Sequence, residues 1–246
     1  MVIGSEIHYL LNTSSTMDDC RTLAKSGAPE GTIVSADRQG SGRGRFERSW
    51  ISPSGENILM SVLVYPEISH LTYLNMVASL AVSDTAFEIT GLSASIKWPN
   101  DVQISNKKLC GILIESEISG SSVEYAVIGI GLNVNLDPLK NPEIKDTATS
   151  LSHETSKFVS RSQTFKSLIG NLDKYYEQVK NGQSLTSEWS NRVNTIGETI
   201  NLSFPGTRRK SIKGVAESVK EDGSLLVRQD DDTIFTAVAG EVTLRG

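Results

Sequence analysis

A short apolar run leads directly into a loop rich in glycine and arginine in the stretch Thr32-Ile33-Val34-Ser35-Ala36-Asp37-Arg38-Gln39-Gly40-Ser41-Gly42-Arg43-Gly44-Arg45-Phe46-Glu47-Arg48-Ser49-Trp50. Residues 32–36 predict a buried strand. Residues 39–50 carry three glycines and three arginines without an apolar period, so they predict a loop. Because α/β folds commonly place ligand sites at strand ends, we expect this loop to bind a ligand.

The residue types of the loop suit a nucleotide phosphate. Glycines allow a backbone to approach a ligand closely, and guanidinium groups offer paired donors to phosphate or carboxylate. The indole of Trp50 offers a flat face for a base. Taken alone, the segment is equally compatible with a solvated, flexible loop, and the rest of the chain has to decide.

Composition limits the classes of protein to which the chain can belong. Its 246 residues are 38% hydrophobic, enough for one substantial core and a small second one. The formal net charge of -5 argues against broad, nonspecific nucleic-acid binding. Cys20 and Cys110 form neither a disulfide framework nor a thiolate metal site. The N-terminus lacks a basic segment followed by an apolar run, so we expect a cytoplasmic protein without a membrane anchor.

Strand and helix patterns alternate up to about residue 193, which predicts an α/β (α+β) domain with a mixed β-sheet flanked by helices. Residues 71–89 are expected to form a long amphipathic helix that ends at Gly91. Residues 102–104 and 109–115 predict a hairpin. Further strands are predicted at 6–11, 57–65, 93–98 and 123–130, and further helices at 17–24, 160–181 and 185–193.

From about Asn194 the pattern changes to short alternating segments, at 199–204, 211–218, 224–229 and 233–238. Turn residues such as Pro205-Gly206 and Asp222-Gly223 separate them. We therefore predict two domains, a main domain at 1–193 and a small SH3-like β-barrel at 194–246.

Several common sites are excluded by their motifs. The chain has no Gly-Lys-Ser or Gly-Lys-Thr and therefore no Walker A loop. Gly129-Ile130-Gly131 lacks the third glycine of a dinucleotide fingerprint, because Val134 stands at that position. The three histidines do not have zinc-site spacing. No Gly-x-Ser-x-Gly elbow supports a serine hydrolase.

Three polar turns at strand ends remain, namely the arginine loop, Lys97 to Asp101, and Lys107 to Gly111. Together they would place several cations around one cavity, as a reaction that handles a triphosphate requires. Without that context, Lys107-Lys108 is better interpreted as a solvated hairpin tip and Trp98 as a core aromatic.

Taken together, these motifs resemble those of the biotin protein ligases. The resemblance covers essentially the whole chain and rests on five blocks in the family's order: Gln39 to Trp50, Lys97-Trp98-Pro99-Asn100-Asp101, Lys107 to Glu115, Gly129-Ile-Gly-Leu-Asn-Val-Asn135, and Gly240 to Arg245. It implies a biotin/lipoate ligase fold. It also implies a two-step reaction, in which biotin and Mg-ATP give biotinyl-AMP and a lysine of a carboxylase's biotin carrier domain then receives the biotin.

The resemblance assigns expected roles residue by residue. The expected catalytic residues are Arg45, Lys97, Asn100 and Lys108. Biotin contacts are expected from Ser15, Thr16, Met17, Gln39, Gly42, Arg43, Gly44, Arg45, Lys108, Gly129 and Gly131. ATP or adenylate contacts are expected from Arg43, Arg45, Arg48, Trp50, Lys97, Asn100, Asn133 and Arg245, with Trp50 beside adenine. No metal ligands are assigned, and Mg²⁺ is expected to arrive on the ATP phosphates.

Three positions depart from the family pattern. Met17 replaces the asparagine of Ser-Thr-Asn and so removes a polar contact on the biotin side. Glu47 stands where the family often has glycine. Cys110 takes a position where a small residue is usual, and we interpret it as a small buried filler rather than a redox group.

Two other functions remain as alternatives, a lipoate or octanoate ligase or transferase of related fold, and a noncatalytic RNA-binding module that uses the arginine loop and Arg208-Arg209-Lys210. The first predicted strand begins within ten residues of the N-terminus, so we expect no DNA-binding domain and no repressor function. A homodimer is common in the family, but no apolar edge in the sequence establishes one.

Overall fold

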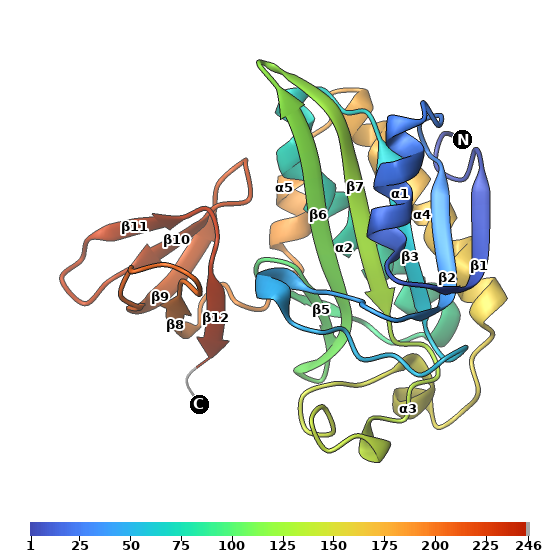
Figure 1. Cartoon of the computed structure of the whole chain (residues 1–246). Coiled ribbons are helices and arrows are strands. Elements are labelled where there is room, and N and C mark those ends of the chain that lie inside the picture. Colours follow the sequence, from blue (N-terminus) through green and yellow to red (C-terminus); the bar gives the residue numbers. More distant parts are fainter. Residues whose placement is uncertain (245–246) are drawn as a thin grey trace.

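The computed structural model describes residues 1–244, which form two β-sheets with helices packed on the larger one (Figure 1). No helix within this range is both long and apolar enough to cross a membrane. The part built on the larger sheet comprises β1 (Ile7–Thr13), α1 (Thr16–Lys25), β2 (Ile33–Gln39), β3 (Ile58–Val64), α2 (Leu74–Thr90), β4 (Ser95–Lys97), β5 (Asp101–Ile104), β6 (Lys107–Ser119), β7 (Ser122–Leu132), α3 (Leu151–Thr155), α4 (Arg161–Lys180) and α5 (Thr186–Ser190).

The larger sheet is mixed, as predicted. Its seven strands are ordered β1-β2-β3-β7-β6-β5-β4, and only β1 and β2 pair in parallel. The predicted hairpin between β5 and β6 is confirmed. Ser105 and Asn106 at its turn both have positive φ, which is the geometry of a two-residue hairpin turn.

Helices cover both faces of this sheet. The helix α1 packs on one face against β2, β3 and β7, while α2 and α4 lie on the other face (Figure 1). Two separate apolar clusters result, a small one under α1 that contains Met17 and Cys20, and a large one that extends from the α2 side into the small sheet. The larger sheet therefore lies between two hydrophobic cores, one on each face.

The expectation that residues 71–89 form an amphipathic helix is wrong in one respect. The segment contains a 3₁₀ turn at Ile68–Tyr73 followed by α2, and α2 is buried on most of its sides. The reason is its position between the sheet and α4, which packs along it. A helix enclosed by two layers carries apolar and small residues all round rather than one apolar stripe.

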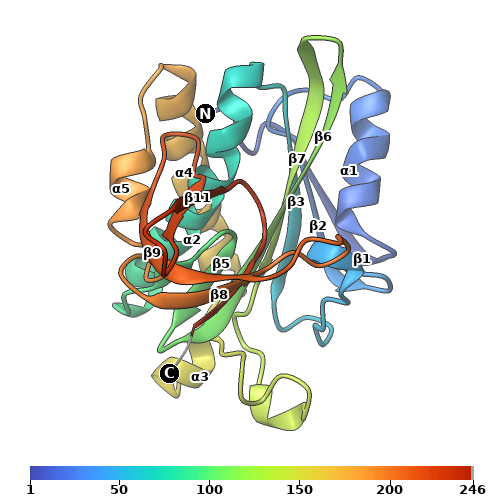
Figure 2. The same ribbon diagram turned by 90° about the vertical axis from the view of Figure 1, so that its left-hand side faces the viewer.

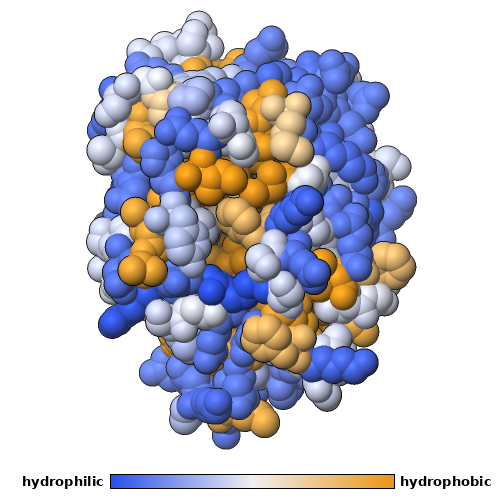
Figure 3. Space-filling view, turned by 90° about the vertical axis from the view of Figure 1, so that its right-hand side faces the viewer, coloured by the Kyte–Doolittle hydropathy of each residue, from blue (hydrophilic) through white to orange (hydrophobic). Residues whose placement is uncertain are grey.

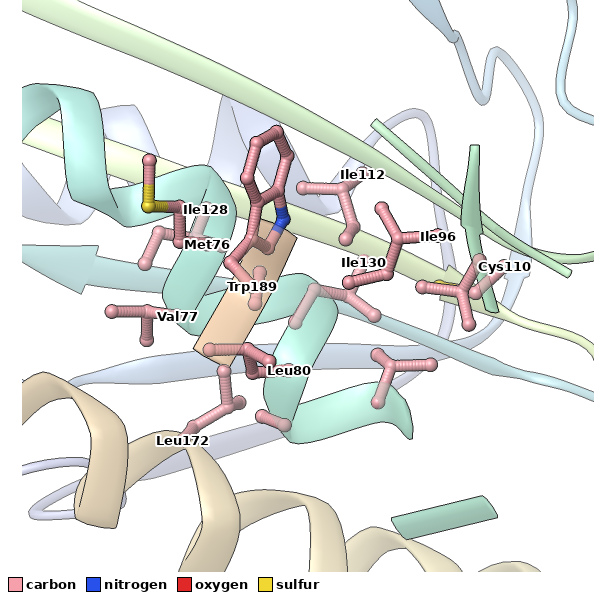
Figure 4. Packing of buried hydrophobic residues seen from close by; sticks show 14 of the residues in the cluster. Met76, Val77, Leu80, Ile96, Cys110, Ile112, Ile128, Ile130, Leu172 and Trp189 are labelled. Atoms are coloured by element: carbon pink, nitrogen blue, oxygen red, sulfur yellow. The ribbon is translucent and has the colours of Figure 1, made fainter. Parts of the chain in front are cut away.

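Trp189, on the short helix α5, closes the core near the junction of the two sheets. Its side chain is 1% exposed and packs among apolar residues that include Met76, Leu80 and Ile112 (Figure 4). Its indole Nε1 donates to Ser79 Oγ at 2.9 Å. The buried donor is therefore satisfied, as an indole in an apolar core requires.

The smaller sheet contains β8 (Thr199–Ser203), β9 (Ile212–Val219), β10 (Leu225–Arg228), β11 (Ile234–Ala237) and β12 (Glu241–Leu244). It is antiparallel, with the order β11-β10-β9-β8-β12. It lies beside the larger sheet in Figure 1 and stands in front of it in Figure 2. The first four strands were predicted, whereas β12 was not. The placement of the domain boundary between residues 193 and 194 stays a prediction.

The strand β1 forms an open edge of the larger sheet and exposes Ile7, Tyr9 and Leu11. Figure 3 views the molecule from this side and shows apolar patches within a largely hydrophilic surface. Tyr9 is held by a hydrogen bond to Asp37, which also pairs with Arg161 at the start of α4. The hydroxyl of Tyr9 is therefore linked to α4 through Asp37, while the side chains of Ile7 and Leu11 are exposed to solvent.

Candidate active site

A cavity of about 590 Å³ lies between the larger sheet and the loop that follows β2. This volume lies in the usual range of small-molecule sites. Segments that are far apart in sequence meet around it, and most of the predicted site residues line it: Ser15, Thr16, Met17, Gln39, Arg43, Gly44, Arg45, Arg48, Trp50, Lys97, Asn100, Lys108, Gly129, Gly131 and Asn133.

Among the described residues, one predicted site residue, Gly42, does not line the cavity. Gly42 instead closes the loop on itself, because its carbonyl accepts a hydrogen bond from the Trp50 backbone N–H at 2.9 Å. The expectation that Gly42 contacts biotin is therefore not supported by its position. Arg245 lies outside the described residues, as does the side chain of Glu47.

The floor of the cavity is a patch of sheet without side chains. Gly111 on β6 and Gly131 on β7 are register partners, and Gly129 lies two residues before Gly131 on the same strand. A Cβ at Gly131 would lie 2.6 Å from the Trp50 ring, and one at Gly129 would lie 2.6 Å from the Met17 sulfur. The glycines therefore make room first for these two protein side chains.

This arrangement alters two expectations. The ring of Trp50 lies over Gly111 and Gly131 on the cavity floor. The sequence predicted only a contact with adenine for this ring. Gly111 was missed as a site residue, although its place in β6 opposite a glycine of β7 could have been found by pairing the two predicted strands.

Adding one methyl group at Gly131 should disturb the site without unfolding the protein. We expect Gly131→Ala to raise the KM for biotin by about tenfold, since the overpacking would displace Trp50 at a cost of roughly 1–3 kcal/mol. Steady-state kinetics with varied biotin would measure the change. Gly170→Ala is the matched control, because a Cβ there meets nothing within 4 Å; equal KM values in the two variants would contradict this explanation.

A hydrogen-bonded group closes one end of the cavity. The backbone N–H of Thr16 donates to Gln39 Oε1 at 2.7 Å, and its hydroxyl lies 3.0 Å from the same oxygen and 2.8 Å from Ser61 Oγ. Thr16 and Ser61 are both buried. These contacts fix the orientation of the Gln39 amide and leave its Nε2 as a donor toward a ligand. Ser61 was not predicted.

Lys108 lies at the centre of the site. Its Nζ is 2.6 Å from Asp101 Oδ1 and 5.5 Å from the centre of the Trp50 ring. The contact with Asp101 is an ion pair rather than an aligned hydrogen bond, since that oxygen has no hydrogen-bond partner. The interpretation of Lys108 as a solvated hairpin tip is therefore wrong, because the strand pairing turns it into the cavity.

Arg45 lines the cavity and has no carboxylate partner among the described side chains. No acidic side chain of the described residues lies within 4.0 Å of it, and its Nη1 donates to Asn100 Oδ1 at 3.2 Å and to the Gly240 carbonyl at 3.1 Å. Burial lowers the pKa of its guanidinium. A cation that only neutral acceptors hold is poised to bind an anion.

The other two loop arginines are paired with carboxylates. Arg48 contacts Glu241 of β12 through both terminal nitrogens, with Nη2 to Oε2 at 2.7 Å. Arg43 makes a similar paired contact with Asp18 of α1. The loop is thus attached at one end to α1 and at the other to the small sheet, so residues from both sheets define the cavity.

The contact between Arg48 and Glu241 should matter modestly for ATP binding. Both side chains are partly exposed, so we expect Glu241→Gln to raise the KM for ATP by at most about fivefold. Kinetics with varied ATP would test this. Glu217→Gln is the control, because it removes a comparable partner from Arg228 within the same sheet but away from the loop, and it should leave the KM for ATP unchanged. A similar rise in KM in both variants would contradict a role of Glu241 in ATP binding.

Three other residues make contacts within the protein core or the cavity wall, and the ATP contact expected of Asn133 stays a prediction. Trp98 is 2% exposed and its Nε1 donates to the Gly223 carbonyl at 2.9 Å, so the core interpretation is correct. Asn133 is buried and bonded to Thr149 and Asn57, which makes it a support for the cavity wall. Cys110 is fully buried, which raises the pKa of its thiol, and the filler interpretation holds.

Comparison with known proteins agrees with this site. The model of the biotin/lipoate A/B protein ligase family matches residues 10–133, which include most of the cavity. The chain belongs to this family. Among its relatives in the family, the bifunctional ligase/repressor BirA of Bacillus subtilis is 34% identical over 94% of this chain and 71% of its own length. The biotin--[acetyl-CoA-carboxylase] ligase of Mycobacterium tuberculosis is 29% identical over 98% of this chain and 90% of its own length.

Solved structures of the same family show the same fold. The biotin protein ligase from Aquifex aeolicus in complex with biotin and ATP superimposes with a TM-score of 0.83 and 30% identity, over 98% of this chain and 99% of that one. The predicted fold class, a mixed sheet with helices and a small C-terminal β-module, is therefore confirmed.

Proposed function

We propose that this ligase activates biotin with ATP as biotinyl-AMP and transfers it to a lysine of a biotin carrier domain, such as that of acetyl-CoA carboxylase. One observation carries the proposal. A single cavity combines a flat glycine floor, a fixed amide donor at Gln39, and cations at Arg45, Lys97 and Lys108. This combination suits a small acid and a nucleotide together.

The first step joins two anions. An oxygen of the biotin carboxylate attacks the α-phosphorus of ATP, a new P–O bond forms, and the bond to pyrophosphate breaks. Like charges oppose this approach, so cations are needed around both partners. Arg45 and Lys97 have no ion-pair partner among the described residues and supply net positive charge. Lys108, held by Asp101, orients the attacking carboxylate.

The buried end of the cavity is the proposed place for the ring system of biotin. Thr16 and Gln39 offer hydrogen bonds there, and Met17 adds an apolar surface in place of the amide expected in the family. Met17 packs over Gly129 within the α1 cluster. A thioether can contact an apolar ring edge but cannot donate a hydrogen bond, so Gln39 carries more of the polar recognition in this chain.

In the second step the lysine amine attacks the carbonyl carbon of the mixed anhydride, an amide bond forms, and AMP leaves with the bonding electron pair while the amine loses a proton. The adenylate is labile to water and to stray amines. The loop of residues 39–50 lies over the cavity, attached to α1 by Arg43 and to the small sheet by Arg48, and so shields it. We propose that 1–193 is the catalytic domain and that 194–246 completes this cover.

We expect Mg²⁺ to bind together with ATP. Within residues 1–244 no cluster of three or more His, Cys, Asp or Glu side chains could hold a metal ion by itself. Asn100 lines the cavity, and its side-chain oxygen is of the kind that Mg²⁺ accepts alongside phosphate. This residue would hold the ion, which would neutralise part of the triphosphate charge.

One experiment tests the proposed function directly. The protein is incubated with ATP, Mg²⁺ and either biotin or lipoate, and pyrophosphate release and the adenylate mass are measured. Biotinyl-AMP is the expected product. A lipoyl adenylate alone would favour a lipoate ligase, and the absence of any adenylate would favour a noncatalytic module. The homodimer expected from the family stays a prediction, to be checked by the solution mass.

A further inference from the structure

Two buried asparagines, Asn57 and Asn133, lie next to each other behind the cavity wall. Asn57 directly precedes β3 and Asn133 directly follows β7, so the sheet brings together two residues that are far apart in sequence. Asn133 lines the cavity, whereas Asn57 does not. Asn57 was not predicted as a site residue. Any effect of Asn57 on a bound substrate therefore has to pass through its neighbours.

The hydrogen bonds of this pair run in one direction. The backbone N–H of Val134 can only donate, and it donates to Asn57 Oδ1 at 3.0 Å. The amide nitrogen of Asn57 therefore faces Asn133 and donates to its Oδ1 at 3.2 Å. This leaves Asn133 Nδ2 to donate to the carbonyl oxygens of Thr149 at 3.0 Å and Lys108 at 3.5 Å. Because carbonyl groups only accept, backbone groups at both ends fix the orientation of both amides.

Lys108 depends on these bonds because it lies where the pairing of its strand ends. The register of β6 with β7 begins at Cys110 and Leu132, two residues beyond Lys108. The carbonyl of Lys108 accepts from the backbone N–H of Thr149 at 2.9 Å and from the Asn133 amide. A lysine side chain is long and flexible, so the place of its ammonium depends on how firmly its backbone is held.

We propose that Asn57 is a positioning residue, which orients the amide of Asn133 and thereby fixes the backbone of Lys108 and the place of its ammonium in the cavity. The effect on catalysis rests on the proposed function, whereas the hydrogen bonds do not. Without the Asn57 amide, the Val134 N–H and Asn133 Oδ1 lose a buried partner. The Asn133 amide is then free to turn away from the two carbonyls that it holds.

Asn57→Ala should therefore lower the rate of biotinyl-AMP formation by about 10- to 30-fold, since displacing a reacting group by about 1 Å costs up to about 10²-fold. The KM values for biotin and ATP should change by less than about threefold, because an interaction that acts only in the transition state lowers kcat. Single-turnover assays at saturating biotin and ATP measure the rate, and steady-state kinetics measure the two KM values. A rise in KM with an unchanged rate overturns the proposal.

A double-mutant cycle with Lys108 separates positioning from general damage. If Asn57 acts through Lys108, adding Asn57→Ala to Lys108→Ala should slow formation of biotinyl-AMP by no more than about twofold. Independent effects would multiply instead. A further loss as large as that of Asn57→Ala in the wild-type background overturns the proposal.

Asn171→Ala is the matched control for the loss of a buried amide. Asn171 donates to Thr85 and Glu88 between α4 and α2, and it does not line the cavity. This variant should lower the melting temperature but keep the wild-type rate of biotinyl-AMP formation. An equal loss of rate in Asn57→Ala and Asn171→Ala overturns the proposal. If Asn57→Ala does not fold, Asn57→Ser, which keeps a polar group, replaces it in the same cycle.

Hydrogen exchange tests the same contacts without any activity. The Thr149 N–H, which donates to the Lys108 carbonyl, should exchange at least about fivefold faster in Asn57→Ala, because exchange follows the population of the locally open state. It should keep the wild-type rate in Asn171→Ala, and NMR measures both rates. Unchanged exchange in Asn57→Ala overturns the positioning of Lys108. If the wild type forms no biotinyl-AMP, the proposed function fails while the exchange rates still decide whether Asn57 fixes Lys108.

Discussion

Lys108→Ala is expected to slow formation of biotinyl-AMP by about 10²- to 10³-fold, the usual loss when one group that stabilises developing charge is removed. The reason has two parts. The variant loses the ammonium nearest the attacking carboxylate, and it leaves Asp101 as an unbalanced carboxylate facing two anionic substrates. The second step involves a neutral amine and should slow less. Single-turnover assays of each step, with biotinyl-AMP supplied for the second, measure both losses.

Two further variants sharpen this test. Asp101→Asn in the Lys108→Ala background removes the repelling carboxylate and should recover part of the lost rate. Lys107→Ala changes the preceding residue, which does not line the cavity because alternate residues of a strand face opposite sides, and its rates should match the wild type. Equal losses in the two half-reactions of Lys108→Ala would refute the assigned role.

Arg45→Gly is expected to weaken retention of the adenylate by about 10- to 100-fold, as removal of a charge-assisted hydrogen bond of about 1.5–3 kcal/mol implies. Among the described residues, the Arg45 guanidinium is hydrogen-bonded to Asn100 and the Gly240 carbonyl and lies over the Phe46 ring, so its charge is available to the phosphate. The released biotinyl-AMP should then label lysines of bystander proteins. Streptavidin blots of a mixture with an unrelated protein, together with the dissociation rate of the adenylate, measure the leakage.

Arg45→Lys keeps the charge but loses the forked geometry, and it should retain the adenylate better than Arg45→Gly. This comparison distinguishes loss of charge from the added flexibility of a fourth loop glycine. Bystander labelling by Arg45→Gly at the wild-type level would contradict the assignment of Arg45 to the adenylate.

The sequence identified the site more completely than it identified the contacts inside it. The segments Gln39 to Trp50, Lys97 to Asp101 and Lys108 were expected to meet, and residues from each line one cavity. Such segments are detectable because glycine, arginine and polar turns interrupt apolar strands. Gly42 closes the loop through its bond with Trp50, a role that sequence spacing does not distinguish from that of a glycine facing a ligand, and its contact with biotin stays a prediction.

The carboxylates that hold the loop were not predicted. Asp18, Glu115 and Glu241 lie on α1, β6 and β12, and the first two have acidic neighbours of the same type in the sequence, Asp19 and Glu117. Only the packing of α1 on the sheet and the pairing of β12 with β8 bring these three to Arg43 and Arg48.

Local chemistry along the chain was thus sufficient for the fold class, most strand and helix positions and the residues of the ligand loop, because hydrophobic period and turn residues act over short separations. The tertiary structure alone decided which of the loop cations is paired. Ion pairing depends on distances between residues far apart in sequence, and among the described side chains those distances leave Arg45 without a carboxylate while Arg43, Arg48 and Lys108 each have one. The three loop arginines, which look equivalent in the sequence, all line the cavity, but Arg43 and Arg48 are paired with carboxylates of α1 and β12 while Arg45 is held by Asn100 and the Gly240 carbonyl.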